Sequence, residues 1–217
     1  MKPRHRGRGL PPDVARGCAA PDVRKGSAFP GMNLNFAARL RLAGLAGAPN
    51  MNRRIVIVGF MGCGKTTVAK TLARRMGCTM IDLDSFITEQ KGRSPAEIIA
   101  QDGEPPFREI ETGALSDVLE NGDPRVIALG GGAWTIEANR ALIAQRDCLS
   151  VWLDAPFELC WERITANAKT IRPLAPNRGT AQKLHQSRQA SYRLAQLHVD
   201  ATKGLAEVVS EITRGLV

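Results

Sequence analysis

Residues 59–67 read GFMGCGKTT, and they carry the clearest chemical signal in this 217-residue chain. They fit the phosphate-binding pattern G-x-x-x-x-G-K-[ST], which ends here at Thr66. In such a loop the glycines let the backbone turn tightly, so that successive N–H groups point at phosphate oxygens. The helix that follows adds a partial positive charge at its N-terminus. We therefore expect Lys65 to reach the β- and γ-phosphates of a nucleotide and the Thr66 hydroxyl to bind Mg²⁺.

The other loop residues are expected to contact ATP through their backbone. A chance glycine-rich turn is the alternative, but the β-branched run 55–58 precedes the loop and an apolar segment with helical spacing, 68–76, follows it. Cys63 is either a thiol whose pKa is lowered by the helix N-terminus or an inert small residue. The predicted ATP-binding residues of the loop are Gly62, Cys63, Gly64, Lys65, Thr66 and Thr67.

Asp82 and Asp84 lie downstream, at the end of a second apolar run. Two carboxylates at a spacing of two point the same way from an extended backbone. One could then hold a metal-bound water while the other contacts a substrate hydroxyl. The alternative is a helix N-cap, which Asp84 would supply to a helix beginning near Ser85.

Arg108 and Glu111, in the segment GEPPFREIE, lie three residues apart and so share one face of an expected helix. Spacing alone favours a solvated surface pair over an anion-binding arginine. Arg188, on a later helix, is likewise either a surface charge or an anion clamp. Residues 167–180, NAKTIRPLAPNRGT, have the composition of a mobile lid from which Arg172 could meet the phosphates, with a plain surface loop as the alternative.

Three glycines, at 130–132, follow the apolar run VIAL. A strand that ends in glycines can bring bare backbone N–H groups next to a ligand. A plain loop is the alternative. No acidic residue ends this strand, so the Walker-B aspartate usual at this place in P-loop nucleoside triphosphatases is absent.

Short apolar runs alternate with helical patterns from residue 54 onward, which predicts βαβ units and a parallel sheet. Ligands of such sheets bind beyond the carboxyl ends of the strands, so the motifs above should share one edge. Strands are expected at 54–58, 79–82, 125–129, 149–153 and 198–200, and helices at 65–76, 84–91, 95–101, 106–120, 136–145, 157–165, 180–195 and 204–215.

The basic charge of the chain belongs to its N-terminal part. Residues 1–50 carry nine basic and two acidic side chains, a net charge of +7, which leaves +2 for the remaining 167 residues of a chain with +9 overall. We expect this part to be a disordered extension with a weak helix at 32–48. It contains a second candidate start at Met32, a third follows at Met51, and an organelle-targeting segment is the other alternative.

Cysteine usage and hydropathy indicate a cytoplasmic protein. Five cysteines occur, with no C-x-x-C pair, so neither a disulfide framework nor a zinc site is expected. There is no run of 18 apolar residues, so no membrane span is expected either.

The motifs together resemble those of the shikimate kinases. The phosphate loop, the D-x-D pair, G-E-x-x-F-R-x-x-E, the glycine triplet, an R-P-L lid and R-x-x-x-Y occur here in the family's order. The resemblance covers about residues 52–216. Two positions depart from the family pattern, since Gln196 stands where the family has alanine and Ala175 stands where another leucine is common.

This resemblance implies an α/β, three-layer P-loop kinase fold over 51–217, with about five parallel strands, helices on both faces and a mobile lid. It implies phosphorylation of shikimate on its 3-hydroxyl, with ATP as co-substrate and Mg²⁺ as cofactor, in a monomer. The implied catalytic residues are Lys65, Asp84 and Arg172; the implied acceptor-binding residues are Asp84, Arg108, Glu111, Gly130, Gly131, Gly132 and Arg188; Arg172 also contacts ATP, and Thr66 and Asp82 serve the metal.

Three other functions remain open at this stage. Another small P-loop kinase, such as one acting on gluconate, would share the loop and fold but not the F-R pattern or the glycine triplet. A non-catalytic P-loop domain is disfavoured, because Lys65, Thr66 and Asp82 are all retained. A nucleic-acid binder would depend on residues 1–50 alone, and we expect none.

Overall fold

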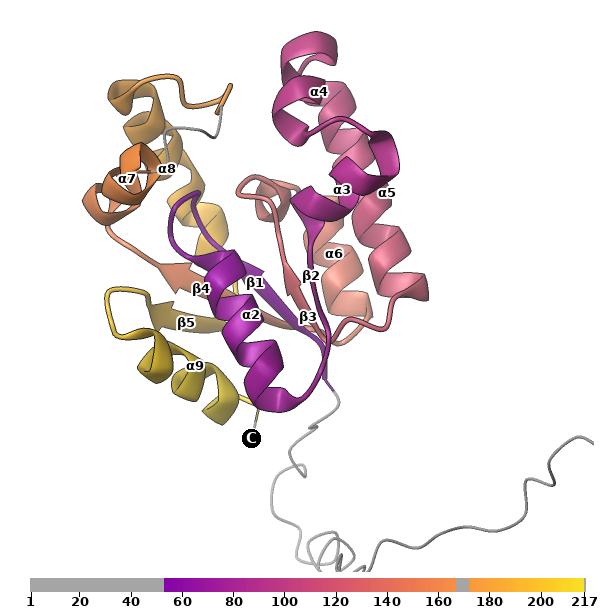
Figure 1. Ribbon diagram of the computed structural model, residues 1–217, viewed down its shortest axis with the longest axis vertical. Helices are drawn as coiled ribbons and strands as arrows, with labels where there is room; N and C mark the ends of the chain where they lie inside the picture. Colours follow the sequence, from indigo (N-terminus) through magenta and orange to yellow (C-terminus); the bar gives the residue numbers. More distant parts are fainter. Residues whose placement is uncertain (1–52, 167–171, 217) are drawn as a thin grey trace, which may run out of the picture. The chain divides into compact units, whose positions relative to one another are not determined.

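The computed structural model describes residues 53–166 and 172–216 (Figure 1). The predicted extension, the predicted helix at 32–48 and part of the predicted lid lie outside these residues. Within them, strands and helices alternate along the chain. The strands are β1 (Ile55–Val58), β2 (Met80–Asp82), β3 (Val126–Ala128), β4 (Leu149–Asp154) and β5 (Leu197–Asp200). The helices are α2 (Lys65–Met76), α3 (Leu83–Lys91), α4 (Pro95–Asp102), α5 (Glu104–Asn121), α6 (Glu137–Gln145), α7 (Phe157–Ala166), α8 (Arg178–Tyr192) and α9 (Leu205–Arg214), with a 3₁₀ turn, η1 (Ala133–Thr135).

The five strands form one parallel sheet in the order β2-β3-β1-β4-β5, which confirms the predicted fold class. In Figure 1, α2 and α9 lie in front of the sheet while α5 and α6 lie behind it. β1 is the central strand, and all four of its residues are buried. Burial on both faces explains why its sequence is a continuous apolar run rather than an alternating one.

Helix α2 fixes the end of β1 in place. It buries Val68, Ala69, Leu72 and Ala73, a spacing that forms one stripe against the sheet. The helix ends where Gly77 adopts a left-handed conformation (φ 61°) and donates its N–H to the carbonyl of Ala73. The turn between β1 and α2, which holds the phosphate-binding motif, is therefore anchored at both ends.

Helix α8 differs from its predicted range of 180–195. It begins two residues earlier because Asn177 caps it, with Oδ1 accepting the N–H of Thr180 at 2.9 Å. It ends at Tyr192, three residues early, because the chain turns there toward β5. None of the described helices is long and apolar enough to cross a bilayer.

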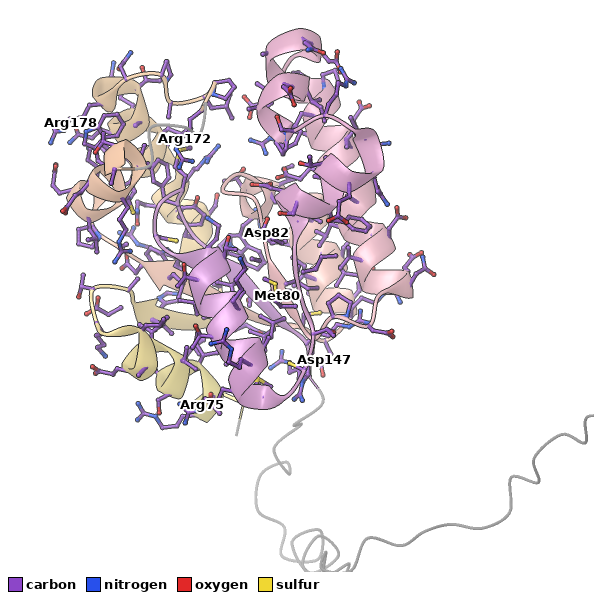
Figure 2. The ribbon with its side chains drawn as sticks, in the orientation of Figure 1. Arg75, Met80, Asp82, Asp147, Arg172 and Arg178 are labelled. Carbon is purple, nitrogen blue, oxygen red and sulfur yellow. The ribbon has the colours of Figure 1, made fainter. Side chains whose placement is uncertain are left out.

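The carboxyl ends of β1, β2 and β3 lie at one edge of the sheet, as the parallel arrangement requires. Figure 2 shows Asp82 and Arg172 near this end of the molecule and Asp147 at the other. The predicted clustering of the motifs along one edge is therefore present in the fold.

Candidate active site

The backbone conformation of the phosphate loop depends on its glycines. Gly59, Gly62 and Gly64 have φ angles of 142°, 81° and 103°, which side chains other than glycine rarely adopt. A Cβ on Gly62 would also lie 2.6 Å from the carbonyl oxygen of Cys160. Lys65 curls back over the loop, where its Nζ donates to the carbonyls of Gly59 and Phe60, each at 3.0 Å. The lysine is thus held over the loop, at the N-terminus of α2.

Thr66 and Asp82 meet directly beside this loop. The Thr66 hydroxyl donates to Oδ2 of Asp82 at 2.6 Å, and Oδ1 of Asp82 accepts the N–H groups of Asp84 and Ser85. Asp82, not Asp84, is therefore the N-cap of α3, and Asp84 lies inside its first turn. The expectation that both carboxylates project from one extended strand is wrong, because the strand ends at the first of them.

The Thr66–Asp82 pair fits a magnesium ion. No cluster of three or more His, Cys, Asp or Glu side chains suited to a metal occurs among the described residues. Mg²⁺ does not require one, because it usually keeps several waters and is bound through one or two protein oxygens together with substrate phosphates. A hydroxyl oxygen joined to a carboxylate at the mouth of a phosphate loop supplies that donor set.

Asp84 is a carboxylate that lines the larger cavity of the site, whose other lining residues are described below. Its side chain is open to the cavity, but the surrounding protein reduces its solvation and raises its pKa, and the nearby Asp82 carboxylate raises it further. Lys65, Arg108 and Arg172 oppose this change. A carboxylate with a raised pKa among three cations suits a group that accepts a proton.

Arg108 and Glu111 are not a solvated surface pair. The Glu111 side chain is 1% exposed and that of Arg108 17%. Nη1 of Arg108 donates to Glu111 at 2.6 Å, while Nε and Nη2 donate to Oε1 of Glu104 at 3.1 and 2.7 Å. A guanidinium has five N–H donors, so one remains on each terminal nitrogen. That pair can hold a carboxylate with two hydrogen bonds.

Glu111 is an ionisable group in the core. Burial raises its pKa to about 7, while the adjacent Arg108 acts to lower it. Its second oxygen, Oε1, is buried and has no hydrogen-bond partner among the described residues. The Glu111 carboxylate therefore depends on a single close ion pair for its charged form.

The glycine triplet is needed because side chains lie against it. A Cβ on Gly130 would come within 2.5 Å of Glu111 and 2.7 Å of Asp84, and one on Gly132 would overlap the guanidinium of Arg108. The sequence predicted glycines that expose backbone N–H groups, but the described contacts give a further reason for them. The triplet lets three charged side chains converge on one point.

A cavity of 610 Å³ is lined by these charged side chains and by the glycine triplet. Arg188 lines it and is 6% exposed, so its interpretation as a surface charge is wrong. Arg172, in the described part of the predicted lid, also lines it. Its Nε is buried without a partner among the described residues. The wall also includes apolar side chains such as Ile99 and Phe107. A mostly apolar cavity with a few convergent charges is typical of a small-molecule site.

A second cavity, of 280 Å³, borders the phosphate loop at Cys63, Gly64 and Thr67. Arg163 of α7 and Lys203 after β5 line it, and Arg163 donates to the carbonyls of Gly62 and Cys63 at 3.4 and 3.3 Å. Neither basic residue belongs to a motif, so neither was predicted from the sequence. Burial raises the pKa of Cys63, so its interpretation as an activated thiol is wrong.

Comparison with known proteins identifies the family. The family model described as shikimate kinase matches residues 61–216. The chain belongs to the shikimate kinase family. The shikimate kinase of Cereibacter sphaeroides is 40% identical over 160 residues, which span 72% of this chain and 78% of the relative. The shikimate kinase of Geobacter sulfurreducens is 40% identical over 168 residues, or 76% and 91%.

Solved structures agree with this family. The shikimate kinase from Acinetobacter baumannii in complex with shikimate has a TM-score of 0.69 and 31% identity, covering 76% of this chain and 92% of that one. A gluconokinase from Sinorhizobium meliloti 1021 has a TM-score of 0.53 at 19% identity, covering 76% and 92%. The gluconokinase therefore shares the fold alone, whereas the shikimate kinases share the family.

Proposed function

We propose that this protein transfers the γ-phosphoryl group of ATP to the 3-hydroxyl of shikimate. The observation that carries the proposal is the convergence of Asp84, Arg108 and Arg188 on one cavity at the mouth of the phosphate loop. Shikimate is a small cyclic acid with three hydroxyls. Its carboxylate calls for guanidinium groups, and its hydroxyls call for a hydrogen-bonding carboxylate.

At the acceptor end, the two free N–H donors of Arg108 would bind the shikimate carboxylate, with Arg188 as the second cation. Glu104 and Glu111 hold the Arg108 guanidinium from two sides, which fixes the direction of those donors. Asp84 would accept a hydrogen bond from the attacking hydroxyl and take its proton. Its raised pKa favours that role.

At the nucleotide end, the loop amides would bind the phosphates. Lys65 and Arg172 would neutralise charge on the transferred group, since phosphoryl transfer is mostly positioning and charge stabilisation. Mg²⁺, held through Thr66 with Asp82 behind it, would add positive charge at the phosphates. The second cavity, beside Arg163, is the space that the proposal assigns to the base and ribose of ATP.

We further propose that the protein acts as a cytoplasmic monomer. Every group assigned a role above comes from a single chain, so a partner is not needed to complete the site. The absence of C-x-x-C spacing among the five cysteines agrees with a reducing compartment.

A side-by-side assay tests the proposal. Purified protein with ATP and Mg²⁺ is given shikimate or gluconate, and ADP release is followed with a coupling system. We expect turnover with shikimate and background rates with gluconate. Phosphorus and proton NMR of the product should place the phosphate on the 3-hydroxyl. No shikimate-dependent ADP release, or equal rates with gluconate, would overturn the proposed function.

A further inference from the structure

The R-x-x-x-Y segment of α8 contains a residue to which the reaction described above gives no role. Tyr192 is fully buried, and its ring stacks on Trp152 of β4 with 6.1 Å between centroids. Its hydroxyl donates to the carbonyl of Gly131 at 2.5 Å, across 61 positions of sequence. Burial raises the Tyr192 pKa, so the hydroxyl keeps its proton and remains a donor.

The accepting carbonyl lies at the centre of a β-turn. The N–H of Ala133 donates to the carbonyl of Gly130 at 3.2 Å, which makes Gly131 and Gly132 the two central residues. Gly132 has φ −106° and ψ −18°, the conformation of a type I turn. A type II turn differs by a flip of the central peptide and needs a positive φ at this second position, which glycine adopts freely. This turn could therefore take either form on sequence grounds.

The central peptide matters because it borders the acceptor cavity. Its carbonyl belongs to Gly131 and its N–H to Gly132, and the two point in opposite directions in a trans peptide. With the carbonyl directed at Tyr192, the Gly132 N–H points away from α8. That N–H has no acceptor among the described residues, and both glycines line the cavity.

We propose that Tyr192 is a positioning residue for the acceptor, which holds the Gly131–Gly132 peptide in its type I orientation so that the Gly132 N–H faces the bound shikimate. The inference rests on the proposed function. Arg188 lies one helical turn before Tyr192, and its Nη1 would be 3.4 Å from a Cβ on Gly131. One face of α8 therefore sets both the peptide and the adjacent cation.

Tyr192→Phe tests this directly, since it removes only the hydroxyl and keeps the ring on Trp152. We expect the KM for shikimate to rise about fivefold, equivalent to about 1 kcal/mol, while the KM for ATP stays within twofold. The shikimate-induced rise in Tm should shrink and the nucleotide-induced rise should not. This second readout reports binding even if turnover becomes too slow to measure.

Trp134→Phe is the matched control. The Trp134 indole N–H donates to the carbonyl of Ser191 at 2.9 Å, so it joins the same helix to the same loop without touching the central peptide. We expect it to lower Tm while leaving the shikimate KM within twofold.

Three results would overturn the inference: an unchanged shikimate KM in Tyr192→Phe, an equal rise in both KM values, or the same shikimate effect in Trp134→Phe. Turnover of shikimate by the wild-type protein in the same assay tests the proposed function separately. If the wild type turns over shikimate and Tyr192→Phe matches it, only the role of Tyr192 is wrong.

Discussion

The nucleotide end and the acceptor end of this site are built in opposite ways. The nucleotide end is one continuous stretch, residues 59–67, whose backbone and Lys65 do most of the binding. The acceptor end gathers side chains from α3, α5 and α8 around the glycines that follow β3. A continuous loop needs only local geometry, and it is shared by kinases with many acceptors. A dispersed site depends on packing, and its buried charges decide which acceptor fits.

The glycines of the two ends are needed for different reasons. Gly59, Gly62 and Gly64 are needed for backbone angles that other residues avoid. Gly130 and Gly132 have no such angles and are needed because charged side chains occupy the space of a Cβ. Substitutions at the two ends should therefore fail for different reasons and affect different substrates.

Lys65→Ala should have the largest effect, and mainly at the nucleotide end. Removing a cation that stabilises the transferred phosphoryl group should lower kcat by about 10²–10³. Shikimate binding, measured as its effect on Tm, should change much less, because Lys65 contacts the loop carbonyls and not the arginines, and acts on the acceptor end only through its charge near Asp84. An equal loss of shikimate binding would mean that the two ends are not separable.

Gly132→Ala should impair shikimate binding while leaving the phosphate loop intact. The new Cβ would overlap the Arg108 guanidinium, so kcat/KM for shikimate should fall at least tenfold, or about 1.4 kcal/mol. Gly113→Ala, in α5, is the control, because its Cβ would meet nothing within 4 Å, and we expect less than a threefold loss. Steady-state kinetics of both variants decide this, and equal losses would contradict the account.

The pH dependence of the shikimate KM should differ from that of the ATP KM, because burial raises the Glu111 pKa to about 7. As pH falls through 7, protonation removes the charge that pairs with Arg108, so the shikimate KM should rise a few-fold while the ATP KM does not follow. Glu111→Gln should lack this acid limb. If Glu111→Gln keeps the wild-type profile, another group is responsible.

The same group makes a prediction for stability. A folded-state pKa above the ordinary value of 4.5 means that the native state binds more protons than the unfolded state between about pH 4.5 and 7. The Glu111 contribution to the free energy of unfolding should therefore fall as pH rises through that window. Urea titrations at several pH values, with Glu111→Gln as the control, measure it.

Removal of residues 1–50 should have the smallest effect. They carry +7 of the charge and none of the motifs, and we propose that they are dispensable for catalysis. A chain beginning at Met51 should keep its turnover with shikimate. A loss of more than tenfold, about 1.4 kcal/mol of barrier, would show that this part contributes to the site.

The sequence was enough to predict the sheet, because the alternation of apolar runs and helical patterns is a local signal. Five strands were expected, and the described part of the chain contains five, each with ends within one residue of its predicted range. The phosphate loop was predictable for the same reason. The nucleotide end of the site is local in sequence, so its chemistry can be inferred without knowing the packing.

The acceptor end was harder to predict because spacing does not report burial. Arg108 and Glu111 have the spacing of a surface ion pair, and only the packing of α5 shows that the glutamate lies in the core. Asp82 and Asp84 have the spacing of neighbours on a strand, but β2 ends between them. Arg163 was missed because it reaches the loop from about a hundred positions away.

Gln196 shows how a departure from the family pattern can be accommodated. Its Oε1 accepts from Nη2 of Arg53 at 2.9 Å, and its backbone N–H donates to the Ser150 hydroxyl at 3.0 Å. These contacts join the start of β5 to the first residues of the sheet, far from the carboxyl ends of the strands. This departure from the family pattern therefore lies outside the proposed site.

A double comparison of Arg108→Ala with Arg163→Ala tests the separation of the two ends most directly. Shikimate and ATP affinities are measured on both variants by calorimetry, and kinetics are measured in parallel. We expect Arg108→Ala to weaken shikimate binding at least tenfold with ATP affinity unchanged, and Arg163→Ala to weaken ATP binding at least tenfold with shikimate affinity unchanged. Arg108→Lys should recover only part of the loss, because an ammonium cannot reproduce the planar fork. Normal shikimate affinity in Arg108→Ala, or parallel losses of affinity for both ligands in either variant, would show that the two ends are not separate.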